Sequence, residues 1–236
     1  MLNWDHTKHD FSAIEETLYK YFPIKNFELY NEENVQNFQG FKEIEEILND
    51  NFFTTKNYRE RWGKFKKFLK QEFKKTIYES MVAWYPCYSG FIVLQKDSNK
   101  NLTYRKELHF FISLLGPYYT ILGIDKSEVQ LEEAFRDLDQ AENSIIRTYP
   151  ANHVLTVSPY MEYKESFIIL QKKILEYFPS LKYVPYQVNL RKVEGISLLY
   201  PESEGNIKDS VFSALFKPDH SLNTTTRGDA FYGYDE

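Results

Sequence analysis

Apolar residues recur at steps of three and four positions along the first third of the chain, which is the spacing of amphipathic helices. The first such series consists of Phe11, Ile14, Leu18 and Phe22. Pro23 follows directly and ends the pattern. The same spacing predicts helices over residues 41–48 and 58–77, and the second of these has apolar residues on one side and lysines on the other.

The period changes to two in the middle of the chain. Residues 90–95 are a short apolar run, and residues 102–115 alternate between polar and apolar before they become continuously apolar. Turn-forming residues separate these runs at 97–100 and at Gly116-Pro117. We therefore predict a three-stranded antiparallel meander over about residues 88–125.

The second half of the chain mixes both periods. Ser127 and Gln130 match a capping box, which predicts a helix over the acidic stretch 127–143. The remaining patterns predict strands at 153–157, 183–190 and 196–200, and helices at 158–178 and 211–216.

These elements predict an α+β fold, in which N-terminal helices pack on a mainly antiparallel sheet of four to six strands that includes the meander. Further helices are expected on one face of this sheet. We expect a single domain over residues 1–217, with a mainly helical part at 1–77 and a sheet-containing part at 78–217. Residues 218–236 are expected to form a flexible tail.

The composition excludes several classes of protein. Cys87 is the only cysteine, so the chain can form neither an intrachain disulfide nor a thiolate metal cluster. No apolar run approaches the roughly 20 residues of a membrane span, and the polar start, MLNWDHTKHD, lacks the apolar centre of a secretory signal. We therefore expect a cytoplasmic protein. The 19 Tyr and 19 Phe either serve recognition or reflect the base composition of the gene.

Charge is distributed unevenly along the chain. The net charge is −5, yet residues 55–75 carry seven Lys and two Arg against two Glu, so the rest of the chain sums to −12. The basic side of the predicted helix carries Lys66, Lys67, Lys70 and Lys74. These side chains could neutralise nucleic-acid phosphates. The net negative charge disfavours that function, and a solvated helix face is the simpler interpretation.

The alternation in the predicted second strand places Arg105, Glu107 and His109 on one side. A four-residue turn at 97–100 would set His109 opposite Tyr88, and a tight turn at Gly116-Pro117 would set it opposite Ile124. An enzyme, a hydrolase or transferase of small polar substrates, could then use His109 as acid or base, Glu107 as its orienter and Arg105 to bind an anion. The simpler interpretation is the solvated face of an antiparallel sheet.

Other candidate chemistry is sparse. The same register places Cys87 opposite Phe110 and away from His109, which disfavours a Cys-His nucleophile pair. His6 and His9 have metal-ligand spacing but lack supporting ligands, so we predict no metal site. No sequence motif for a cofactor is present, and the Arg-Gly-Asp tripeptide at 227–229 is interpreted as a chance match.

The leading hypothesis is a non-catalytic intracellular protein-binding protein. An acidic chain rich in tyrosine has the physical character of an inhibitor, such as an immunity-type protein, for a cationic protein partner. The carboxylates expected to steer association are Glu132, Glu133, Asp137 and Asp139. No cofactor, membrane or nucleic-acid partner is expected.

Overall fold

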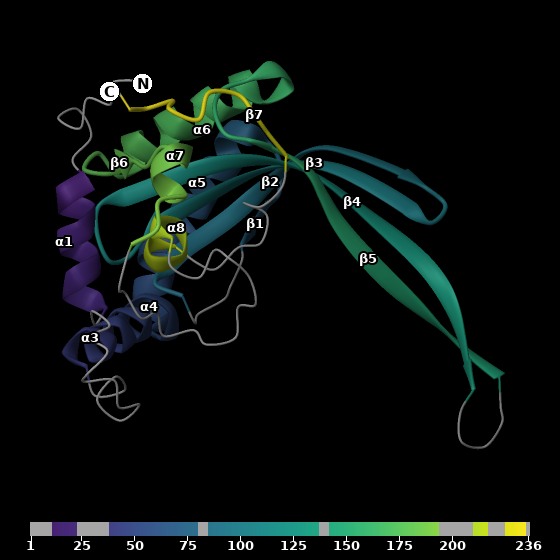
Figure 1. Cartoon of the computed structure of the whole chain (residues 1–236), viewed down its shortest axis with the longest axis horizontal. Helices are drawn as coiled ribbons and strands as arrows, with labels where there is room; N and C mark the ends of the chain where they lie inside the picture. Colours follow the sequence, from purple (N-terminus) through teal and green to yellow (C-terminus); the bar gives the residue numbers. More distant parts are fainter. Residues whose placement is uncertain are drawn as a thin grey trace.

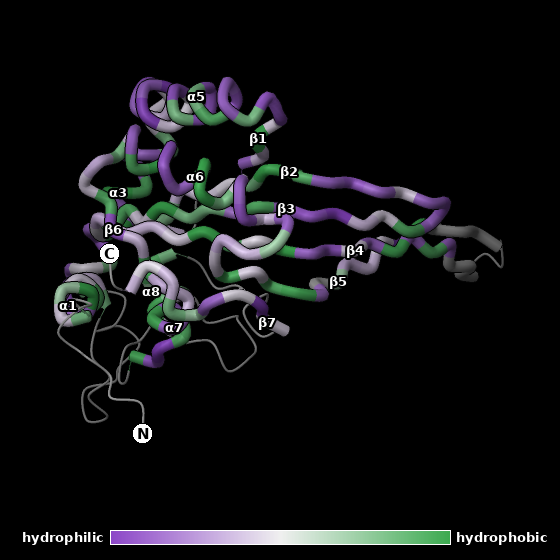
Figure 2. The backbone as a smooth tube through the Cα atoms, turned by 90° about the horizontal axis from the view of Figure 1, so that it is seen from above, coloured by the Kyte–Doolittle hydropathy of each residue, from purple (hydrophilic) through white to green (hydrophobic). Residues whose placement is uncertain are grey.

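A seven-stranded sheet with helices on both sides forms the described part of the chain (Figures 1 and 2). The computed structural model describes residues 11–22, 38–79, 85–136, 142–193, 210–216 and 225–234. The strands are β1 (Ile77–Glu79), β2 (Cys87–Asn99), β3 (Leu102–Ser113), β4 (Tyr118–Arg136), β5 (Glu142–Thr156), β6 (Lys182–Tyr183) and β7 (Thr225–Arg227). Strands β1 to β5 are antiparallel neighbours in chain order, while β6 joins β4 and β7 joins β5 in parallel.

The meander of β2, β3 and β4 confirms the alternation seen in the sequence, but its register differs from the expected one. Strands β2 and β3 are joined by only two residues, because Lys100 adopts a left-handed conformation with φ of 42° and Asn99 lies opposite Leu102. A β-bulge between Val93 and Gln95 shifts this ladder by one further residue, so His109 faces Phe91 on β2. On its other side His109 faces Leu122 on β4. The four-residue turn was wrong because the polar residues at 97–99 continue the strand.

One face of the sheet, called the α5–α6 face, is covered by two helices and the segments before them. Helix α5 (Lys64–Phe73) follows α4 (Thr55–Tyr58) and a π-helical turn at Arg59–Gly63, and α6 (Lys164–Tyr177) follows a 3-10 turn at Met161–Tyr163. The apolar side of α5 and of the π-helical turn before it is buried here, as its spacing predicted. The indole of Trp62, in that turn, stacks on Tyr88 with ring centroids 4.1 Å apart.

The opposite face, called the α1–α8 face, has its own apolar core. It is covered by α1 (Phe11–Tyr21), α3 (Gln39–Leu48), α7 (Tyr186–Asn189) and α8 (Val211–Leu215), and a π-helical turn at Asn49–Phe53 extends α3. The ring of Phe111 on β3 contacts Phe212 in an edge-on geometry, 5.1 Å between centroids. The α+β class is thus confirmed, whereas the helices cover both faces of the sheet instead of one (Figure 2).

The acidic stretch 127–143 is not helical, which corrects the prediction from the capping box. Its first ten residues belong to β4, which pairs with β5 in an unbroken ladder from Lys126 opposite Asn152 to Arg136 opposite Glu142. Ser127 lies within the strand, where its hydroxyl contacts the ring of His153 instead of capping a helix. Long-range strand pairing thus outweighs a local helix signal.

The stretch 183–190 is also different from its predicted strand. Only Lys182–Tyr183 pairs with β4, and Pro185 then begins the single helical turn of α7. Asn189 on that turn is fully buried and donates hydrogen bonds to Thr120 Oγ1 and to the carbonyl of Val184, at 3.0 and 3.2 Å. The turn is therefore fixed by side-chain hydrogen bonds that alternation does not reveal.

The remaining elements follow the predictions with shifted boundaries. The strand at 153–157 is the end of β5, the helix at 158–178 is α6 and the helix at 211–216 is α8, while the stretch 196–200 lies outside the described residues. Within the segment 218–236 that was expected to be a flexible tail, residues 225–234 lie against the sheet. There β7 pairs with β5, and the backbone N–H of Val157 donates to the carbonyl of Arg227 at 3.1 Å.

Strands β4 and β5 extend far beyond the helical layers as a two-stranded ribbon (Figure 1). The pairing of β3 with β4 ends where Leu102 lies opposite Val129, and beyond that point β4 pairs only with β5 among the described strands. We call residues 130–136 and 142–148 the arm. None of the described helices is long and apolar enough to span a bilayer.

Truncation of a central ring should show that the α5–α6 face holds the fold together. Phe110 is fully buried, and its ring lies 5.9 Å from Phe65 and 6.0 Å from Tyr88. We expect Phe110→Ala to lower the free energy of unfolding by about 3–5 kcal/mol, because the cavity cannot collapse between packed rings. Urea unfolding measures this, and the exposed Phe231→Ala serves as the control. Equal small effects of both substitutions would contradict the assignment of this core.

Candidate functional site

The three polar residues predicted on the second strand come together on the α1–α8 face of β3. The carboxylate of Glu107 is only 2% exposed and lies between the other two side chains. Its Oε2 is 2.9 Å from Nε2 of His109, and its Oε1 is 3.2 Å from Nε of Arg105. The Arg105 guanidinium also pairs with Glu128 on β4, and Lys126 Nζ lies 3.5 Å from the same Glu128 oxygen. We call these five residues the Glu107 network.

The network keeps a buried carboxylate ionised. Burial alone would raise the pKa of Glu107, but the hydrogen bond from His109 and the charges of His109, Arg105 and Lys126 together lower that pKa below its ordinary value of 4.5. Most of the compensation comes from His109, the nearest partner. The carboxylate therefore acts as a fixed negative charge beneath the imidazole.

The imidazole of His109 is held by aromatic contacts as well as by Glu107. Its ring stacks on Phe91 with centroids 4.9 Å apart and planes inclined by 16°, and it lies 6.3 Å from the ring of Phe111. An oriented His-Glu pair is the arrangement of a general base and its orienter. Arg105, however, is engaged by two carboxylates, so its charge is already balanced within the protein.

The proposed steering carboxylates do not share one described surface. Glu132 is exposed on β4 in the arm, and the backbone of Glu133 follows it on the same strand. Asp137 and Asp139 lie outside the described residues.

A second polar network on the α5–α6 face was not anticipated from the sequence. The hydroxyl of Tyr163 donates to Asp125 Oδ1 at 2.8 Å, and Arg227 lies 3.5 Å from the same oxygen. Arg227 also donates to Thr156 Oγ1 at 2.8 Å and to Glu162 Oε1 at 2.7 Å. Since Asp125 and Arg227 are 102 positions apart, the only local signal is an acidic residue at the end of an apolar run.

The charges of this second network support one another. Burial alone would raise the pKa of Glu162, but hydrogen bonds from Lys106 and Arg227 lower it to about 2. Burial together with Asp125 raises the pKa of Tyr104 to about 12. Arg227, which the sequence presents as part of a chance tripeptide, is therefore a structural residue that fastens β7 to the sheet.

A serine and a histidine meet at the start of the ribbon. Ser127 is buried, and its Oγ lies 2.5 Å from Nε2 of His153. This contact occurs where the ladder between β4 and β5 shifts register after Asp125, so that His153 has no directly opposed residue. Sequence analysis did not predict this pair, because a bulge cannot be located from alternation alone.

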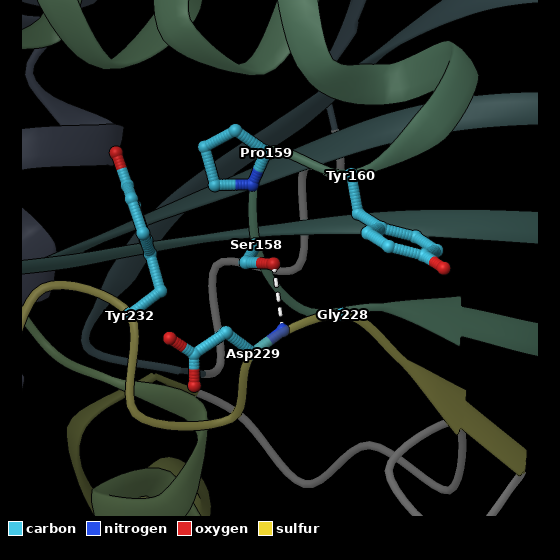
Figure 3. A pocket seen from close by; sticks show the side chains of 6 residues that line it. All are labelled: Ser158, Pro159, Tyr160, Gly228, Asp229 and Tyr232. Atoms are coloured by element: carbon cyan, nitrogen blue, oxygen red, sulfur yellow. Dashed lines mark hydrogen bonds between the residues drawn. The ribbon is translucent and has the colours of Figure 1, made fainter.

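A pocket of about 460 Å³ lies beyond the end of β5 (Figure 3). It opens between the segment that follows β5 and the segment that follows β7. Its lining residues are Ser158, Pro159, Tyr160, Gly228, Asp229 and Tyr232.

The cysteine and metal predictions can now be placed on the structure. Cys87 lies opposite Ser113 and not opposite Phe110, so it shares the face of His109, contrary to the expected register. Cys87 is buried, and its partner Ser113 is four residues from His109 along β3. At about 3.3 Å per strand residue, this places Cys87 roughly 13 Å from His109 along the strand direction. Among the described residues no group of three His, Cys, Asp or Glu could hold a metal ion, and His6 and His9 lie outside them.

The basic face of α5 is partly engaged. Lys66 pairs with Glu79, whose carboxylate also accepts hydrogen bonds from Tyr58 and Tyr88 at 2.5 and 2.8 Å. Lys67, Lys70 and Lys74 are exposed.

Comparisons with known proteins add no functional information. No protein family, no curated protein and no solved structure matches the chain.

The stability of the protein should depend on the ionised state of Glu107. Because the folded state lowers the pKa of Glu107, its stabilising contribution is complete above pH 4.5 and is lost as the pH falls through the folded value. We expect Glu107→Gln to lower the free energy of unfolding by about 1–3 kcal/mol at pH 7. The difference from the wild type should shrink on acidification below pH 4.5.

Urea unfolding at several pH values tests this expectation. The exposed Glu132→Gln serves as the control and should change the free energy of unfolding little. A difference for Glu107→Gln that stays constant between pH 7 and pH 3 would show that the carboxylate charge does not stabilise the fold.

Proposed function

We propose that this is a non-catalytic, intracellular protein-binding protein and that it binds a cationic protein partner through the arm. The observation that carries the proposal is the arm itself, a two-stranded ribbon that projects from the helical layers (Figure 1). Such a ribbon buries little apolar surface of its own and is marginally stable in isolation. A partner that packs on the ribbon would cover its side chains, which none of the described helices covers.

Large apolar side chains on the arm and at its base support protein binding. Leu131 is 45% exposed, Tyr149 44% and Ile146 73%. Leu102, Val129 and Tyr149 lie side by side across three strands, and Leu131 follows on the same face. We call these four residues the apolar stripe. Exposed apolar side chains that adjoin one another mark interaction sites more often than isolated ones do, and tyrosine is enriched among them.

The charge of the ribbon supports a cationic partner. Residues 126–152 contain six acidic and three basic residues, a net charge of −3. Glu132 is exposed and lies opposite Ile146, on the face of the arm away from the stripe. Carboxylates at the rim of an interface accelerate association with an oppositely charged partner. An inhibitor or immunity-type protein would use such a projection to enter a concave, cationic surface.

A specific observation also favours the enzyme alternative. The His109 and Glu107 side chains form an oriented pair 2.9 Å apart. A hydrolase or transferase would still need an anion-binding group, and Arg105 is already paired with Glu107 and Glu128. The geometry therefore supports binding by the arm better than catalysis at His109.

Removal of apolar surface from the stripe should weaken partner binding. The partner is first captured on the wild-type protein from its native cells, identified by mass spectrometry and purified. We then expect Leu131→Thr with Tyr149→Thr to raise Kd at least roughly tenfold, because exposed apolar anchors dominate interface energies and threonine keeps the strand conformation.

The matched control replaces exposed apolar residues of the helices, Tyr19→Thr with Ile168→Thr, and should leave Kd unchanged. Calorimetric titration measures both variants. Equal affinity of the arm variant and the wild type would refute the proposal, and concentration-dependent self-association through the stripe would identify a second copy as its occupant.

The exposed carboxylate of Glu132 should act mainly on the association rate. We expect Glu132→Gln to lower the association rate constant about twofold at low salt, with little change in dissociation, and we expect this difference to vanish at about 1 M salt as charges are screened. Stopped-flow mixing with the purified partner measures it. Glu165→Gln, on the exposed side of α6, is the control. A salt-independent association rate would contradict a cationic partner.

A further inference from the structure

The pocket in Figure 3 is built by two segments that a hydrogen bond holds together. Ser158 follows β5, and its Oγ accepts the backbone N–H of Asp229, which follows β7, at 2.8 Å. Gly228 precedes Asp229 with φ of 96°, and a Cβ at this position would lie 2.5 Å from Ser158 Oγ. The turn therefore requires glycine at position 228, and the hydrogen bond to Ser158 holds the Asp229 backbone against the segment that follows β5.

The carboxylate of Asp229 supplies the charge of the pocket. Its Oδ1 accepts the N–H of Phe231 at 2.9 Å, which orients the side chain in a turn. In the described ranges no Lys or Arg forms an ion pair with Asp229. The adjacent Arg227 is committed to Asp125 and Glu162. A negative charge thus lines the pocket without a balancing cation from the described residues.

The apolar wall of the pocket is rigid. Tyr232 packs edge-on against Phe167 and Tyr183, with ring centroids 5.8 and 5.6 Å away, and its hydroxyl donates to Gln171 Oε1 at 2.5 Å. In Figure 3 Pro159 lies above Ser158 and to the right of Tyr232, and the Asp229 carboxylate lies below them. An aromatic ring beside a carboxylate is an arrangement that suits organic cations.

We propose that this pocket binds a compact organic cation, a primary ammonium or guanidinium group on a short apolar stem. The cationic head would pair with Asp229, and the stem would lie along Pro159 and the Tyr232 ring. The carboxylate disfavours anions, and one carboxylate is too few for a metal ion. A volume of about 460 Å³ suits a small ligand. This inference does not depend on the proposed function of the arm.

Nuclear magnetic resonance titration of the full chain with butylammonium tests the proposal, with neutral butanol as the matched control ligand. We expect butylammonium to shift the amide signals of Asp229 and Tyr232 with a Kd on the order of 1–10 mM. Asp229→Asn keeps the acceptor for Phe231 and removes the charge, so Kd should rise roughly tenfold or more. Asp97→Asn, in the β2–β3 hairpin, should have no effect.

Gly228→Ala provides a second variant that should weaken binding by displacing Asp229, while the dispersion of the amide spectrum reports whether the fold persists. Methylguanidinium and a blocked tripeptide with a central arginine distinguish a free small amine from a protein side chain as the source of the cation. Tighter binding of either one supports the proposal. Equal shifts with butanol, unchanged affinity of Asp229→Asn, or no shift with any cation would overturn it.

Discussion

The strands of this protein are longer than the helical layers that cover them, and most of its other features follow from this mismatch. Where α5 and α6 lie on one face and α1 and α8 on the other, both sides of β3 and β4 are buried and apolar, with Phe110 and Phe111 pointing into different cores. Each core is rich in aromatic rings packed edge to face. Beyond the layers the strands continue in solvent, and the ribbon has only its backbone ladder to hold it.

Both polar networks lie at the boundary between the covered and uncovered parts of the sheet. Glu107 on β3 and Asp125 on β4 are buried carboxylates. Along each strand, the residues on the side of the helical layers are mostly buried and apolar, and those on the side of the ribbon are mostly half-buried or exposed. The charge of Glu107 is compensated by His109 and Arg105, and that of Asp125 by Arg227. A buried carboxylate without such partners would cost several kcal/mol. Each network therefore lies at the end of one apolar core. The need to compensate a buried carboxylate there explains the charged residues of the network without reference to catalysis.

How much of this was visible in the sequence depends on the range of the interactions concerned. Alternation in β3 brought Arg105, Glu107 and His109 together correctly, because side chains two apart on a strand share a face. The register was wrong because the left-handed residue Lys100 shortens the hairpin and a β-bulge between Val93 and Gln95 shifts the ladder by one more residue. The prediction of a helix over the acidic stretch is wrong because the first ten residues of that stretch pair with β5. The network of Arg227 joins residues 102 positions apart. Neither long-range pairing leaves a local pattern.

The ribbon combines exposure with features that restrain its self-association. Leu131 lies opposite Arg147 and Ile146 opposite Glu132, so these two exposed apolar side chains each have a charged neighbour across the ladder. Charges among exposed strand residues oppose edge-to-edge pairing of copies. At the base of the ribbon, the contact of Ser127 with His153 joins β4 to β5, and the ion pair of Arg105 with Glu128 joins β3 to β4. The ribbon therefore combines an anchored base with exposed apolar and charged side chains, and this is the surface that the proposed partner would bind.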